Sequence, residues 1–235
     1  MTKLAFALKA VTSTDETITW LERIGGAVDC YKLQMDVFGR GGPDVIRRFV
    51  DSGVEVFLDL KFHDIPSVVA MSVETAAEMG VSMLTVHTMG GSDMLAAAAD
   101  AARSASSSLR VLGVTVLTSL DQAQLAAVTG KEQPVEERVM ALAILAKEAG
   151  CDGVVASPHE LKAIKSECGS DFAVVTPGIR LDSPDAKDDQ ARFMTPAQAA
   201  RLGADYVVVG RPIHAAQDPL AAVAEIRRQL EDDSE

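Results

Sequence analysis

The sequence lacks the features that mark nucleic-acid-binding, disulfide-rich or membrane proteins. Its 235 residues hold 22 Lys and Arg against 34 Asp and Glu, and this formal net charge of −12 argues against a basic surface for nucleic acid. The three cysteines, Cys30, Cys151 and Cys168, show no zinc-ligand spacing. The first apolar run, in MTKLAFALKAV, is too short to cross a membrane. We therefore expect a cytoplasmic protein with no nucleic-acid or membrane partner.

Aromatic residues are also scarce, at 4%, but hydrophobic residues make up 48% of the chain and charged residues 24%. This balance is typical of a folded globular protein. No Ser/Gly-rich linker and no shift in composition divides the chain. We therefore predict a single domain over residues 1–235, with a core at about 4–230 and an acidic tail at 231–235.

Short runs rich in Val, Ile and Leu alternate with longer amphipathic stretches, which is the pattern of repeated strand and helix units. The expected strands are Leu4–Leu8, Asp29–Leu33, Val54–Leu60, Met83–His87, Arg110–Leu117, Gly153–Ala156, Phe172–Thr176 and Asp205–Val209. The expected helices are Thr14–Arg23, Gly42–Asp51, Val68–Met79, Asp93–Arg103, Val135–Ala149, Pro158–Lys165, Pro196–Leu202 and Pro219–Leu230. This alternation predicts an α/β fold, the (β/α)8 TIM barrel.

An open, doubly wound sheet is the competing fold, and it normally carries a glycine-rich phosphate turn after the first strand. Here that strand runs into Lys9-Ala10-Val11-Thr12-Ser13, which contains no glycine. The barrel is therefore favoured. The polar stretch 179–194 follows the seventh strand, where barrels often carry phosphate-binding loops, and we expect it to close over a ligand.

Charged residues are dense where the second and third strands end. Alternation along the strand places Asp59 and Lys61 on one face, and Lys32 ends the neighbouring strand. A structural ion pair is one explanation, but a buried charged network costs desolvation energy, so a functional role is favoured. A fixed carboxylate offers negative charge where a substrate loses negative charge, and the neighbouring lysine ammonium can give a proton to a carbanion. This combination suits decarboxylation.

A second group of residues follows the last two strands. Gly178-Ile179-Arg180 comes after the seventh strand and Gly210-Arg211-Pro212 after the eighth. Glycine allows close backbone approach and arginine offers forked donors, so two such turns at equivalent places predict a phosphate site.

The chain resembles the orotidine 5′-monophosphate decarboxylase family from about Leu4 to Leu230. The matching segments are VFLDLKFHDIP (56–66), GVTVLTS (113–119), VTPGIR (175–180), DDQARFMTPAQA (188–199) and GADYVVVGRPI (203–213). The resemblance implies decarboxylation of orotidine 5′-monophosphate to UMP in pyrimidine biosynthesis, by a homodimeric barrel without metal or cofactor.

The resemblance also implies roles for individual residues. Lys32, Asp59 and Lys61 correspond to the family's charged array, to which Asp64 is contributed across the dimer interface, and Lys61 corresponds to the proton donor to C6. The residues expected to contact substrate are Lys9, Thr118 at the pyrimidine, and Arg180, Gln190, Gly210 and Arg211 at the phosphate.

Several positions depart from the family pattern on the sugar and pyrimidine side. Lys9 replaces the usual ribose-binding Asp, and Lys has donors but no acceptor. Gln34 replaces a glycine, and Thr88-Met89 replaces Ala-Ser. Three interpretations follow: an ordinary decarboxylase with altered ribose contacts, which is favoured; a relative acting on a keto-sugar phosphate; or a non-catalytic nucleotide binder.

Overall fold

The structure is a closed barrel of eight parallel strands, each paired with the next in sequence and the last with the first. It is a computed structural model of residues 1–235, and it describes all of them except 9–10, 106–107, 182–193 and 232–235. The strands are β1 (Lys3–Leu8), β2 (Cys30–Gln34), β3 (Glu55–Phe62), β4 (Met83–His87), β5 (Arg110–Val114), β6 (Gly153–Val155), β7 (Ala173–Thr176) and β8 (Tyr206–Val209). The predicted (β/α)8 barrel is confirmed.

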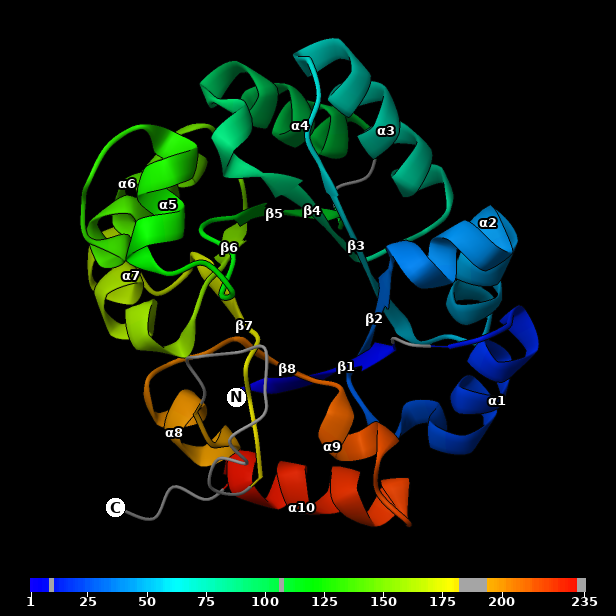
Figure 1. Cartoon of the computed structure of the whole chain (residues 1–235). Helices are drawn as coiled ribbons and strands as arrows, with labels where there is room; N and C mark the ends of the chain where they lie inside the picture. Colours follow the sequence, from blue (N-terminus) through cyan, green and yellow to red (C-terminus); the bar gives the residue numbers. More distant parts are fainter. Residues whose placement is uncertain (9–10, 106–107, 182–193, 232–235) are drawn as a thin grey trace.

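Helices surround the ring of strands (Figure 1). They are α1 (Thr14–Ile24), α2 (Met35–Asp51), α3 (Pro66–Glu78), α4 (Ser92–Ala105), α5 (Gln122–Thr129), α6 (Val135–Glu148), α7 (Leu161–Cys168), α8 (Pro196–Arg201), α9 (Arg211–His214) and α10 (Pro219–Glu231). Three short 3-10 turns, η1 (Gly25–Ala27), η2 (Thr88–Gly90) and η3 (Pro158–Glu160), complete the described elements. Within the described ranges, no helix has an apolar stretch long enough to span a membrane.

Two helices were not predicted, although α5 carries clear sequence signals. Asp121 and Gln124 form a reciprocal capping box at its start, and Gly130 ends it in the left-handed conformation with φ 68°. The other, α9, is a four-residue helix directly after β8.

Helix α2 begins earlier than the predicted start at Gly42. Its backbone breaks at Gly42, with φ 57° and ψ −156°, and a second helical segment continues from Pro43. Proline is well suited to such a start because its φ is already helical. The first segment was missed because Gly39 and Gly41 weaken its helical pattern.

Apolar side chains form two layers of core. One fills the space between strands and helices, while the barrel interior contains mainly small or medium residues together with Phe57 and Tyr206. Alternation explains the division, since Leu4, Phe6 and Leu8 belong to the outer layer and Ala5 and Ala7 to the interior. Interior positions near the C-terminal strand ends are therefore free to carry polar groups.

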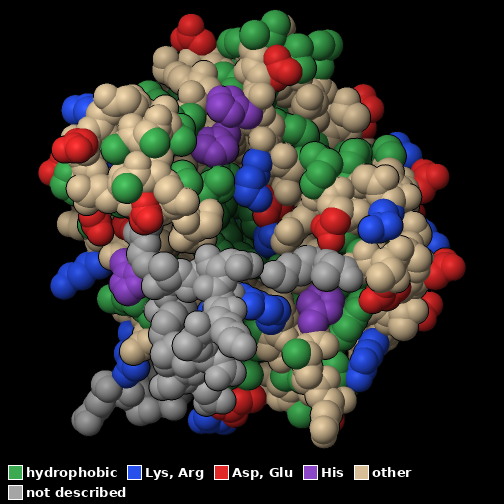
Figure 2. Space-filling view, in the orientation of Figure 1, with side chains coloured by type: hydrophobic (Ala, Val, Ile, Leu, Met, Phe, Trp, Pro, Cys, Tyr) green, Lys and Arg blue, Asp and Glu red, His purple; other side chains and the backbone are tan. Residues whose placement is uncertain are grey.

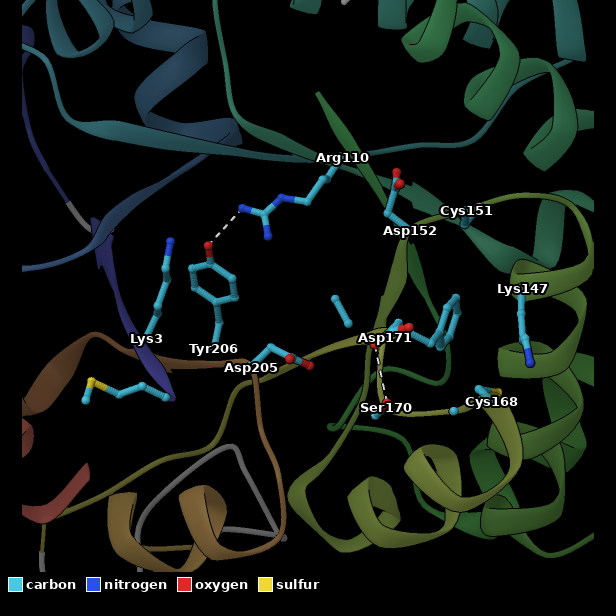
Figure 3. Close-up of a pocket in the computed structure, with 14 residues that line it drawn as sticks. Lys3, Arg110, Lys147, Cys151, Asp152, Cys168, Ser170, Asp171, Asp205 and Tyr206 are labelled. Atoms are coloured by element: carbon cyan, nitrogen blue, oxygen red, sulfur yellow. Dashed lines mark hydrogen bonds between the residues drawn. The ribbon is translucent and has the colours of Figure 1, made fainter. Parts of the chain in front are cut away.

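The N-terminal end of the barrel is closed by paired charges beside a pocket of about 770 Å³ (Figure 3). Arg110 donates to the Tyr206 hydroxyl at 2.8 Å, and that hydroxyl donates to Glu55 at 3.2 Å. Lys3 also pairs with Glu55, at 3.2 Å. These charges satisfy one another, as expected at the barrel end that usually serves stability.

Candidate active site

Three charged side chains form consecutive ion pairs at the C-terminal end of the barrel. Lys32 Nζ lies 2.6 Å from Asp59 Oδ2, and Lys61 Nζ lies 2.7 Å from Asp59 Oδ1. Lys32 comes from β2 and the other two from the adjacent β3. The structure therefore assembles the Lys32–Asp59–Lys61 array from residues that the sequence places on two separate segments.

Burial and charge act in opposite directions on Asp59. The residue is only 8% exposed, and burial tends to raise the pKa of its carboxyl, but the charges and hydrogen bonds of Lys32 and Lys61 prevail and lower that pKa to about 2. Asp59 is thus ionised at neutral pH. Lys32 is 7% exposed, whereas the Lys61 side chain is 37% exposed and can meet a ligand.

Gln34 extends the array on the β2 side. Its Oε1 atom accepts a hydrogen bond from Lys32 Nζ at 2.6 Å, so Lys32 is held between an amide oxygen and a carboxylate. Gln34 also lines the adjacent cavity. With its oxygen engaged by Lys32, the side chain still has its amide N–H donors to offer a ligand.

Thr85 of β4 is a site residue that the sequence analysis missed. It is fully buried, and its hydroxyl contacts both Asp59 Oδ1, at 3.0 Å, and the backbone N–H of Lys61, at 2.9 Å. The signal was the alternation of β4, which places Thr85 on the same side as the interior residue Met83.

The array borders a cavity of about 180 Å³. Lys32, Gln34, Asp59 and Lys61 form its charged side, and the remaining lining is mostly apolar: Phe57, Val114, Val116, Leu117, Thr118, Val155, Ala156, Pro177 and Val208. Figure 2 shows hydrophobic side chains in a central hollow with Lys and Arg side chains at its edge. Such a cavity suits a flat, partly apolar ring that carries a charged group on one edge. β5 ends at Val114 rather than at the predicted Leu117, and the residues beyond it help to line the cavity.

The residues expected at the two ends of the substrate are only partly described. Thr118 lines the cavity. Arg180 follows β7, and its backbone N–H donates to the Met194 carbonyl at 3.1 Å. After β8, Gly210 precedes Arg211, the first residue of α9. Lys9 and Gln190 lie outside the described residues, as does most of 179–194. The two predicted phosphate turns thus follow adjacent strands.

Asp64 does not join the array within the described part of this single chain. It is exposed, and its Oδ1 atom accepts a hydrogen bond from the backbone N–H of Ile65 at 2.7 Å. No ion pair joins it to Lys61 among the described residues.

Two histidines pack against each other beside the array. The rings of His63 and His87 are stacked, with centroids 5.2 Å apart and an interplanar angle of 22°. Burial, and then the nearby His63 and Lys61, lower the pKa of His87 below its ordinary value. His87 therefore adds no positive charge beside the array at neutral pH.

The closed parallel barrel, with an ionised Lys–Asp–Lys array at the C-terminal ends of its strands, defines the class of protein. In such barrels the C-terminal face carries the active site, and a buried charged array is the arrangement of a catalytic centre. The protein is therefore a (β/α)8-barrel enzyme.

Comparison with known proteins identifies the family. A sequence profile described as "Orotidine 5'-phosphate decarboxylase / HUMPS family" matches residues 2–226. Orotidine 5′-phosphate decarboxylase of Syntrophotalea carbinolica is 47% identical over 97% of this chain and 94% of its own. The crystal structure of the Lactobacillus acidophilus orotidine 5′-phosphate decarboxylase superposes with a TM-score of 0.88 at 34% identity, covering 98% of this chain and all of that one. The chain belongs to the orotidine 5′-phosphate decarboxylase / HUMPS family.

Proposed function

We propose that this protein decarboxylates orotidine 5′-monophosphate to UMP, a step of pyrimidine biosynthesis. The observation that carries the proposal is the ionised Lys32–Asp59–Lys61 array beside a small, mostly apolar cavity. Relatives named orotidine 5′-phosphate decarboxylase, among them that of Moorella thermoacetica at 46% identity over 90% of this chain, support it.

The chemistry follows from the charges of the array. The bond between C6 and the carboxylate carbon breaks, CO2 leaves, and the electron pair stays on C6. Asp59 repels the substrate carboxylate but not the neutral CO2, while the Lys61 ammonium stabilises the developing carbanion. Lys61 then transfers a proton to C6 and regains one from water. Lys32 keeps Asp59 ionised throughout, because it holds the second carboxylate oxygen at 2.6 Å.

The remaining predicted residues serve to hold the substrate. Thr118 contacts the pyrimidine, Arg180, Gln190, Gly210 and Arg211 bind the phosphate, and Lys9 is assigned to the ribose. Phosphate contacts supply binding energy remote from C6, and this energy aligns the substrate carboxylate against Asp59. Two glycine-arginine turns after adjacent strands support the phosphate assignment.

An absorbance assay of orotidylate decarboxylation by the unmodified protein tests the proposed reaction. We expect turnover of orotidine 5′-monophosphate with no added metal or cofactor and no reaction of keto-sugar phosphates, because the cavity combines a charged side with an apolar one. The keto-sugar phosphates are assayed in parallel, with and without a divalent metal ion.

Each other outcome of that assay contradicts the proposal in a different way. Turnover of a keto-sugar phosphate alone would indicate a relative that acts on a keto-sugar phosphate. Tight UMP binding without any turnover would indicate a nucleotide binder, and a Lys9→Asp variant that gained activity would then locate the defect on the ribose side.

We also infer that the active form is a homodimer in which the partner subunit's Asp64 completes the array. Asp64 is exposed beside Ile65, whose side chain is 62% exposed. Met35, at 59% exposure, and Met71, at 57%, are large apolar residues on α2 and α3, the helices that follow the two array strands. Exposed large apolar side chains on these two helices, and next to Asp64 in the sequence, fit a protein interface.

Mixed dimers test the shared site. Lys61→Ala and Asp64→Ala chains carrying different tags are co-expressed, and the doubly tagged dimers are purified. Each mixed dimer contains one site with an intact Lys61 and the partner's intact Asp64, so we expect about half of the wild-type activity per dimer. Homodimers of either variant should be almost inactive.

A second mixture provides the control for this experiment. Lys61→Ala and Asp59→Ala chains lose groups that lie in the same array of one chain, so their mixed dimers contain no intact site and should stay inactive. A monomeric active protein, or mixed Lys61→Ala and Asp64→Ala dimers without activity, would contradict the shared site.

A further inference from the structure

Thr85 connects the backbone of Lys61 with the carboxylate of Asp59. Its hydroxyl lies 2.9 Å from the Lys61 backbone nitrogen and 3.0 Å from Asp59 Oδ1, and the residue is 0% exposed. A backbone N–H can only donate and an ionised carboxylate can only accept. The hydroxyl oxygen therefore accepts from Lys61, and its proton is donated to Asp59.

The backbone of Lys61 is unusual at this point. With φ at 52°, it is the one residue other than glycine that has a positive φ in the described part of the chain. Side chains disfavour this region by roughly 1–2 kcal/mol, so such a conformation persists only where neighbouring groups hold it. Conformations of this kind occur often at active sites.

The pairing of β3 and β4 explains why a side chain binds the backbone N–H of Lys61. The register between β3 and β4 shifts between Leu58 and Phe62, which interrupts the regular ladder of backbone hydrogen bonds across the array. The Lys61 N–H is bound by the Thr85 hydroxyl, a side-chain acceptor, at this interruption. Thr85 thus satisfies a backbone donor at a place where the ladder between the two strands is irregular.

We propose that Thr85 is a positioning residue for the decarboxylation. Its hydroxyl holds the backbone of Lys61 in the left-handed conformation, and it also fixes the Asp59 carboxylate with which the Lys61 ammonium forms an ion pair. The inference rests on the proposed function, because it concerns the alignment of the same proton donor. Thr85 does not line the cavity and acts through Lys61 and Asp59.

Matched substitutions separate the hydroxyl from the shape of the side chain. Thr85→Val removes the hydroxyl at nearly constant volume, and Thr85→Ser retains it. We expect Thr85→Val to lower kcat roughly 100-fold, because a misplacement of about 1 Å costs that much, with KM and UMP affinity changed less than threefold. Thr85→Ser should keep kcat within about threefold of the wild type.

Thr115→Val is the control for removing a buried threonine hydroxyl elsewhere in the barrel. Thr115 is 1% exposed and donates to the Val155 carbonyl at 3.0 Å, with no contact to the array. This variant should lose stability and keep kcat. A merely structural role of Thr85 would not lower kcat while leaving KM nearly unchanged, and it would not explain a normal kcat in Thr85→Ser.

The outcomes distinguish a failure of the proposed function from a failure of the positioning role of Thr85. A wild-type protein without turnover contradicts the proposed function, whereas an active wild type with an unimpaired Thr85→Val variant contradicts the positioning role alone. Equal loss of kcat in the serine and valine variants also contradicts it, because the hydroxyl is then not the cause. If Thr85→Val does not fold, Thr85→Ala is compared with Thr85→Ser, and equal kcat values overturn the proposal.

Discussion

Replacement of Lys61 with alanine is expected to lower kcat by roughly 10⁵-fold or more, because the substitution removes both proton delivery and electrostatic stabilisation at C6. The Lys61 ammonium is the exposed cation of the array, 2.7 Å from Asp59, and it borders the cavity. Among the described residues, Lys32 is the other cation of the array, and it is buried between Asp59 and Gln34. Steady-state decarboxylation assays measure the loss.

The Lys61→Ala variant should still fold and bind UMP. The substitution removes a side chain that is 37% exposed, and Arg180 and Arg211, which we propose to bind the phosphate, follow β7 and β8 rather than β3. UMP affinity by calorimetry and circular dichroism provide these readouts. Lys3→Ala is a matched control, because Lys3 pairs with Glu55 at the opposite end of the barrel, and it should retain full activity. A Lys61→Ala variant with wild-type kcat would refute the assignment of Lys61 as proton donor.

Replacement of Asp59 with asparagine is expected to lower kcat roughly 10³-fold and to tighten ground-state binding of substrate. Asparagine is similar in size but neutral, so it no longer repels the substrate carboxylate. The ammonium groups of Lys32 and Lys61 then attract that carboxylate without opposition. We therefore expect KM for orotidine 5′-monophosphate to fall together with kcat, while UMP affinity, which involves no carboxylate, changes little.

The same substitution should reduce stability, since it leaves Lys32 buried without its anionic partner. Removal of one member of a buried ion pair costs about 3–5 kcal/mol. The low pKa of Asp59, about 2, gives this loss a pH dependence. A lowered carboxyl pKa stabilises the folded state above the ordinary carboxyl value, and this contribution disappears as the pH falls toward 2.

Urea unfolding of wild type and Asp59→Asn between pH 2 and 7 measures this contribution. The difference in unfolding free energy should be large at pH 7 and shrink as the pH falls through the range between the two carboxyl pKa values. Asp44→Asn is the control, since the Asp44 side chain is 91% exposed and its pair with Arg47 is at the surface. A pH-independent difference, or an increase in KM, would contradict the role assigned to Asp59.

The sequence predicted the secondary structure well where a local hydrophobic pattern reflects burial in the fold. Eight strands were predicted with boundaries within three residues of those observed, because a barrel strand packed on both sides is a nearly continuous apolar run. Helices whose first residues carry glycines, such as the start of α2, were predicted less well. There, weak local preference is overridden by packing against neighbouring elements.

The two-residue period of a strand predicted that Asp59 and Lys61 share one face, and their side chains do form an ion pair, although the register shift between Leu58 and Phe62 interrupts that period. Lys32 could be assigned to the neighbouring strand, but its shared contact with Asp59 depends on the β2–β3 register. Asp64 shows the opposite case. Its segment resembles the family closely, yet in a single chain its side chain is exposed and bound to the backbone N–H of Ile65.

The order of residues along the chain was thus enough to establish the barrel, the charged strand ends and the class of chemistry, because periodicity and charge are local properties. The left-handed backbone of Lys61 and its hydrogen bond to Thr85 were not accessible in this way. They arise from a register shift between β3 and β4 and from contacts between strands. Such contacts depend on distances of a few ångströms between distant segments, which are set when the barrel closes.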